Sequence, residues 1–260
     1  MSIVDAIKKG FAHTNKLLKI VVLFFGFNTA IGLISLPLAN PARTGNPMII
    51  VLSVISSIVF FLIFIFLQGG ALGLVKDQIK TASNDMSQFI GYGKKYYVRI
   101  LSLLLLYVLI AIAVVLILGL ISTGVLLLGD NIITRSLVAT VVTVAAVMII
   151  TMLIYPIYAI VVDEANALEA FKKGISISKK NFWRTLGLFL ATLLVSLVIS
   201  LIIGFLAGIV SIPLNADISQ VLIAIINAGV QSYIPIVMMV AFMNFYMELT
   251  GGEATAQAGK

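Results

Sequence analysis

The sequence contains no cysteine and a single histidine, His13. Without cysteine there is no disulfide framework, thiolate metal site or cysteine nucleophile. One histidine cannot form a histidine-based metal site either. The His-Glu-x-x-His zinc motif, the Gly-x-Ser-x-Gly elbow and the phosphate-binding Gly-x-x-x-x-Gly-Lys loop are also absent. We therefore expect a protein that is not an enzyme, with no catalytic, cofactor-binding or metal-binding residues.

Charge is scarce as well. Only 10% of the 260 residues are charged, 61% are hydrophobic and the mean hydropathy is +1.18. An ordinary soluble domain is about a quarter charged, and no water-soluble fold could cover this much apolar surface. The net charge of +7 would suggest nucleic acid in a soluble protein. Here the excess of positive charge on the inner side of membrane proteins explains it better, so we expect no nucleic-acid partner.

Long hydrophobic runs account for most of the chain, and each is long enough to cross a hydrocarbon core as a helix of about 20 residues. The first run is too long for a signal peptide and is read as a retained span. We predict an all-α membrane protein with one integral membrane domain, 1–260, and a flexible tail, 250–260. The predicted spans are 17–38, 47–70, 97–128, 132–162, 185–212 and 218–249.

Lysine and arginine are distributed unevenly between the connections. The three short turns hold only Arg43 and Arg135, and the remainder lie near the N-terminus, in the two long polar loops and in the tail. Because positive charge stays on the cytoplasmic side, this predicts a multi-pass protein of the cytoplasmic membrane with both termini in the cytoplasm.

A basic tract occurs twice, each time before a span. The order acid-Ala-apolar-Lys-Lys-Gly-apolar runs from Asp5 to Phe11 and again from Glu169 to Ile175. Apolar residues recur at spacings of three and four in both tracts, for example at Val4, Ile7 and Phe11, which is typical of a helix lying in the membrane interface. A weaker relative lies at 94–99. The pattern predicts three repeated units with amphipathic helices on the cytoplasmic side, although shared composition of juxtamembrane segments would also produce it.

The second tract carries the residues most suited to contacting lipid headgroups or a partner protein. Clustered lysines attract anionic inner-leaflet lipids by about 1 kcal/mol per charge, and tryptophan anchors at headgroup depth. The alternative is that these residues only determine topology. The candidate contact residues are Lys172, Lys173, Lys179, Lys180, Trp183 and Arg184.

Nearby carboxylates have a simpler interpretation. Asp163, Glu164 and Glu169 could bind a cation, but Glu169 precedes Lys173 by four residues, which favours an ion pair on the helix surface. We therefore interpret them as structural.

Two patterns lie within the spans. Small residues at four-residue steps predict close helix packing, either inside the protomer or in a homo-oligomer; they are Ser196, Ser200, Gly204 and Gly208. Asn227 and Gln231 share one face of the sixth span. They are explained either by hydrogen bonds between helices or by a polar path.

One region resembles a known family. The segments 155–164 and 169–187 resemble the signature of a broad prokaryotic superfamily of six-span membrane proteins, which includes the membrane domain attached to some glycerophosphodiester phosphodiesterases. Gly174 stands where that signature usually has serine. The resemblance implies a membrane domain without assigned chemistry, and the phosphodiesterase activity is not carried over. The matching residues are Pro156, Glu164, Ala170, Lys172, Lys173, Phe182, Trp183 and Arg184.

Two functions are therefore expected. The first is a non-enzymatic module that interacts with lipid, organises partner proteins or serves as a subunit of a larger membrane assembly. The alternative is a small-solute transporter or channel subunit. The absence of a charged residue at any span centre counts against ion coupling.

Overall fold

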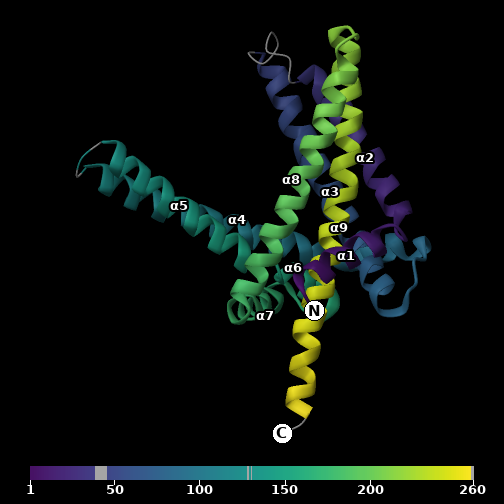
Figure 1. Cartoon of the computed structure of the whole chain (residues 1–260), viewed down its shortest axis with the longest axis vertical. Coiled ribbons are helices and arrows are strands. Elements are labelled where there is room, and N and C mark those ends of the chain that lie inside the picture. Colours follow the sequence, from purple (N-terminus) through teal and green to yellow (C-terminus); the bar gives the residue numbers. More distant parts are fainter. Residues whose placement is uncertain (39–45, 128, 130, 259–260) are drawn as a thin grey trace. The chain divides into compact units, whose positions relative to one another are not determined.

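Every regular element in the described part of the chain is a helix (Figure 1). The computed structural model describes residues 1–38, 46–127, 129 and 131–258. The elements are α1 Ile3–Thr14, α2 Leu18–Leu38, α3 Pro47–Thr81, the short 3-10 helix η1 Met86–Gln88, α4 Phe89–Leu127, α5 Ile132–Met152, α6 Pro156–Val162, α7 Ala167–Lys180, α8 Phe182–Ser211 and α9 Ala216–Ala258.

Six helical stretches are long and apolar enough to cross a membrane, which confirms the prediction of an all-helical chain with six candidate spans. The third stretch begins earlier than predicted because the basic segment around Lys94 runs directly into α4. Helix α9 continues into the predicted tail as far as Ala258, since that segment is rich in alanine, a strong helix former. Three positions used in the sequence predictions, Arg43, Leu128 and Lys260, lie outside the described residues.

The fourth span is interrupted at a proline. Helix α5 ends at Met152 and α6 begins with Pro156 in its first turn, where a missing N–H costs nothing. The hydroxyl of Tyr107 donates to the Leu153 carbonyl over 2.8 Å, which satisfies a carbonyl near the break. Pro235, in contrast, lies inside the continuous helix α9.

The helices of the two basic tracts begin with the same device. Ser2 accepts a hydrogen bond from the Asp5 amide at the start of α1, and Asn166 accepts one from the Glu169 amide at the start of α7. In both, the acidic side chain reaches back to the cap backbone, which completes a capping box. The repeated tract therefore includes its own helix start signal.

The chain forms two compact units, one made of residues 1–97 and 187–260 and the other of residues 98–186. In the first, α1 and α2 both pack against α9, and α2 also contacts α3. Its core lies toward the C-terminal parts of α3 and α9, where Leu72, Val75, Val240 and Tyr246 are at most 1% exposed. The opposite half of α3 is exposed and apolar, as expected of a surface that faces lipid.

In the second unit, α7 packs on α6 and on α5. The Tyr155 hydroxyl lies 3.2 Å from the Thr185 hydroxyl, which donates to it. Arg99 donates to the carbonyl of Glu164 over 2.6 Å. Glu164 itself has a φ of +57°, so the chain turns sharply between α6 and α7. These contacts fix the start of the basic segment that follows.

Candidate functional site

Basic and aromatic side chains cluster where α7 ends and α8 begins. Trp183 is 79% exposed and makes an edge-to-face contact with Phe182, with ring centroids 5.4 Å apart. Lys172 and Lys179 are exposed and have no hydrogen bond or ion pair among the residues that the structure describes. We call this set, together with three neighbouring cations, the α7–α8 basic segment; its members are Lys172, Lys173, Lys179, Lys180, Trp183 and Arg184.

The carboxylates beside this segment pair differently from the sequence prediction. Lys173 forms an ion pair with Asp163 at 3.0 Å, whereas the expected partner, Glu169, is held in the capping box with Asn166. The prediction of a Glu169–Lys173 pair was therefore wrong, because the cap competes for the same carboxylate. Because this ion pair neutralises Lys173 locally, Lys172 and Lys179 are the lysines of the segment that are exposed without an ion pair among the described residues.

The buried faces of α1 and α7 consist mostly of small residues. On α1 the buried residues are Ala6, Gly10 and Thr14, while Val4 from the expected apolar stripe is 59% exposed. On α7 the corresponding positions, Ala170, Gly174 and Ser178, are buried. Both tracts thus dock mainly through small residues, which on α7 are joined by the buried Ile177.

Each of these glycines touches a backbone. A Cβ added at Gly10 would lie 2.8 Å from the Val237 carbonyl oxygen of α9. A Cβ added at Gly174 would lie 2.3 Å from the nitrogen of Pro156 in α6. The spacing Ala-x-x-x-Gly-x-x-x-Thr/Ser occurs in both tracts. This pattern of small residues could therefore have been used to predict the packing face from the sequence.

Charges on α1 stay on its outer side. The Asp5 carboxyl has its pKa lowered mainly by the hydrogen bonds from Ser2, with a smaller contribution from Lys8. Partial burial lowers the pKa of His13, and the charges of Lys16 and Lys9 lower it further. Helix α1 therefore presents lysines to solvent while His13 favours its neutral form.

The small residues of α8 divide into two groups. The Ser196 hydroxyl donates to the Thr192 carbonyl over 2.8 Å and lies 3.7 Å from the sulfur of Met238 on α9. Ser200, Gly204 and Gly208 are exposed, and a Cβ at either glycine would meet no atom within 4 Å. The structure therefore places Ser196 in a contact between α8 and α9 and leaves the other three residues on the exposed surface of α8.

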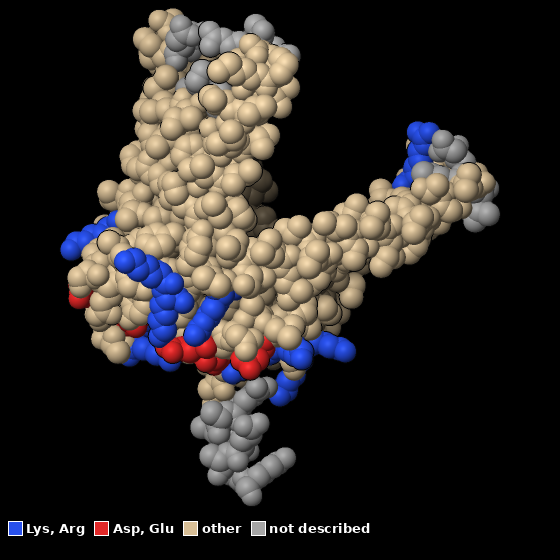
Figure 2. Space-filling view, turned by 180° about the vertical axis from the view of Figure 1, so that it is seen from behind, with Lys and Arg blue, Asp and Glu red and all other residues tan. Residues whose placement is uncertain are grey.

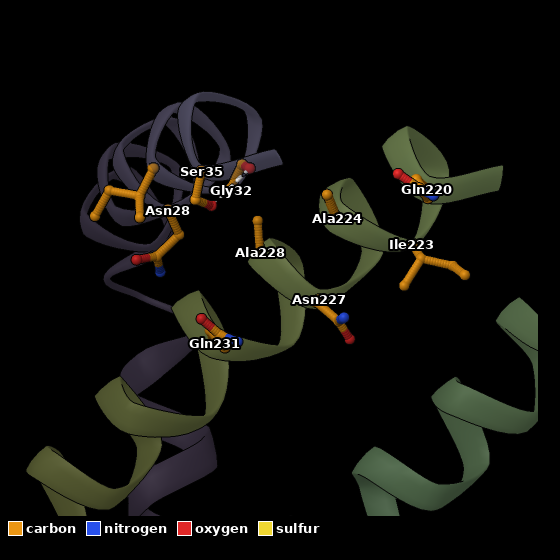
Figure 3. A pocket seen from close by; sticks show the side chains of 10 residues that line it. Asn28, Gly32, Ser35, Gln220, Ile223, Ala224, Asn227, Ala228 and Gln231 are labelled. Carbon is orange, nitrogen blue, oxygen red and sulfur yellow. Dashed lines mark hydrogen bonds between the residues drawn. The ribbon is translucent and has the colours of Figure 1, made fainter. Parts of the chain in front are cut away.

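A polar groove lies between α2 and α9 (Figure 3). It encloses about 510 Å³ and is lined by ten residues, among them Asn28 and Ser35 on α2 and Gln220, Asn227 and Gln231 on α9. The Asn28 side-chain amide donates to the hydroxyl of Ser232 over 2.9 Å. Asn227 points away from α2 in Figure 3 and forms the edge of the groove.

The predicted pair Asn227 and Gln231 is thus brought together with polar residues of another helix. Their amides and that of Gln220 have no hydrogen-bond partner among the residues that the structure describes. Gln220 could have been found from its spacing of seven from Asn227, which keeps it on the same helix face. Asn28 and Ser35 could not, since no sequence pattern says that α2 contacts α9.

The extent of the fold and of both sites can be compared with known families. A family model described as "Domain of unknown function (DUF7847)" matches residues 1–249. The chain belongs to this family. No curated protein and no solved structure matches the chain. The matched range runs from α1 nearly to the end of α9, so the α7–α8 basic segment and the polar groove both lie within the family's domain.

Proposed function

We propose that this protein is a non-enzymatic, multi-pass protein of the cytoplasmic membrane that binds anionic lipid headgroups at the inner surface through the α7–α8 basic segment. The observation that carries the proposal is the 79% exposure of Trp183 in the same segment as Lys172 and Lys179, two exposed lysines with no ion pair among the described residues. A platform that holds lipid in this way would also present a charged face to partner subunits of a membrane assembly.

Tryptophan at this position is explained by a lipid headgroup layer. An indole ring combines a large apolar surface with one N–H donor, so it is favoured where hydrocarbon meets water. Trp183 is the second residue of α8, a candidate span, and therefore lies at one end of a hydrophobic helix. Lys179 and Lys180 precede Trp183 by four and three residues, which would place them at the depth of the lipid phosphate groups.

The proposed orientation rests on the distribution of charge. On the face shown in Figure 2, large areas carry no charged side chains, and lysine and arginine gather in a few places. Both basic tracts precede candidate spans, and few cations occur in the short turns. We therefore propose that α1 and α7 lie at the cytoplasmic surface with both termini on that side.

A threefold repeat is supported by three similar contacts. The end of an even-numbered span meets a basic segment through a glycine: Gly73 of α3 against Tyr92, Gly174 against Pro156 of α6, and Gly10 against Val237 of α9. In the contact between Gly10 and Val237, the first basic segment, α1, meets the sixth span, α9. This is expected if the third unit closes back on the first. We propose that the protein consists of three such units, an arrangement in keeping with the proposed relationship to the six-span superfamily.

Removing charge from the basic segment tests the lipid proposal. The double variant Lys172→Gln/Lys179→Gln should bind phosphatidylglycerol about 30-fold more weakly than the wild type, because two charges contribute about 2 kcal/mol. Native mass spectrometry after purification from a mixture of phosphatidylglycerol and phosphatidylcholine measures this. Arg135→Gln, a change at a short turn, is the control and should retain lipid. Equal retention by the double variant would refute the proposal.

Passage of a small solute is a second candidate function. It is favoured by the polar groove between α2 and α9, which brings five neutral polar side chains into a hydrophobic bundle. Solute flux into proteoliposomes is its direct test, and flux that persists in the Lys172→Gln/Lys179→Gln variant would separate it from lipid binding.

A further inference from the structure

We propose that the groove between α2 and α9 is a binding site for an uncharged group rich in hydroxyls, entered from the end of the bundle where α2 ends and α9 begins. The proposal is independent of lipid binding at the α7–α8 basic segment. It also does not require transport, since a ligand bound in the groove need not be released on the other side.

The lining chemistry defines the ligand class. None of the described residues that line the groove is charged, so a charged ligand would meet no counter-charge from them in a low-dielectric site. The side chains of Asn28, Gln220, Asn227 and Gln231 each offer both donors and acceptors, and Ser35 offers a hydroxyl. Hydroxyl groups have the same dual character, and a volume of about 510 Å³ falls in the range typical of small-molecule sites.

The unpartnered amides require a polar occupant. An amide left against hydrocarbon without a hydrogen bond costs about 1–3 kcal/mol. Three such amides, of Gln220, Asn227 and Gln231, line one groove within a candidate span. Acyl chains cannot satisfy them, whereas water or a hydroxyl-rich ligand can.

The groove has one open end. Gln220 lies four residues after the start of α9, and Gln231 lies about 22 Å further than that start along the helix, at 1.5 Å per residue. The groove, as far as Gln231, therefore extends beyond the middle of a hydrocarbon core of about 30 Å. Past Gln231 the same face of α9 continues with Ile234, which is buried, and Pro235, which is exposed, and neither lines the groove. The polar lining of the groove therefore ends at Gln231.

The absence of cysteine makes a direct test simple. In Gln220→Cys, a membrane-impermeant maleimide should react about tenfold faster than in Val221→Cys, because thiolate forms in water and not in lipid. Val221 is the adjacent exposed residue and does not line the groove. Equal rates in proteoliposomes would show that water does not enter the groove and would overturn the proposal.

The ligand class is tested in the same Gln220→Cys chain. In phosphatidylcholine vesicles, mannitol should slow labelling if the ligand is a free polyol. Without added solute, vesicles that contain a neutral glycosyl diacylglycerol should slow it if the ligand is a hydroxylated lipid headgroup. Adding Asn227→Leu and Gln231→Leu should abolish protection of the cysteine by the polyol or by the headgroup. A thermal unfolding measurement should show that this variant is still folded. Protection by neither source, or protection that survives both substitutions, would overturn the proposal.

Discussion

Replacing Gly174 with alanine should lower the free energy of unfolding by about 3 kcal/mol, the upper part of the range for overpacked sites. The new methyl group would lie 2.3 Å from the nitrogen of Pro156, 2.5 Å from its Cδ and 2.6 Å from its Cα. These are backbone and ring atoms at a helix start, which cannot rotate away. The usual gain of up to about 1 kcal/mol for alanine over glycine in a helix is too small to compensate. Thermal unfolding in detergent measures the loss.

The control for this variant is Gly119→Ala in the same unit. Gly119 lies on an exposed face of α4, and a Cβ there meets no atom within 4 Å. We expect that change to leave stability unchanged or to raise it slightly. If Gly174→Ala behaves like Gly119→Ala, then α7 does not dock on α6 through its small-residue face.

Replacing Gly10 with alanine should release α1 from α9 at a cost of about 2 kcal/mol. The added Cβ would lie 2.8 Å from the Val237 carbonyl oxygen and 3.3 Å from the Ala241 methyl. Release of α1 would also break the hydrogen bond from the Tyr233 hydroxyl to the Asn15 side-chain oxygen, which is 2.8 Å long. Hydrogen exchange measured by mass spectrometry should show faster exchange throughout α1.

Gly91→Ala is the matched change in that unit, because Gly91 has open space around its Cα. It should leave exchange in α1 unaltered. Unchanged exchange in Gly10→Ala would instead mean that Ala6 and Thr14 hold the helix without close approach at Gly10.

The six candidate spans were predictable because length and apolar content decide them locally. The break before Pro156 is also a local effect of its missing N–H, whereas α9 continues through Pro235. The sequence predicted an apolar stripe on α1 and α7 that faces the membrane interface, but not the close backbone contacts at Gly10 and Gly174, because those contacts depend on α9 and α6. Packing partners, unlike spans, depend on residues distant in the sequence.

The two candidate sites also differ in whether their residues are close together in the sequence. All members of the α7–α8 basic segment are consecutive or nearly so, and the sequence named every one of them. The groove joins Asn28 to Ser232 across 204 positions of sequence, and only the structure brings these residues together. Asp163 as the partner of Lys173 depended on the turn at Glu164, which has no clear sequence signal.

The central claim is that both basic tracts lie at the cytoplasmic surface of a six-span protein. Single cysteines at Lys8 on α1, Ser176 on α7 and Ile132 at the start of α5 test it in cells with an impermeant maleimide. All three positions are exposed. We predict that Ile132→Cys is labelled in intact cells, whereas Lys8→Cys and Ser176→Cys are labelled only after permeabilisation. Labelling of either tract in intact cells, or labelling of the two tracts from opposite sides, would contradict the account.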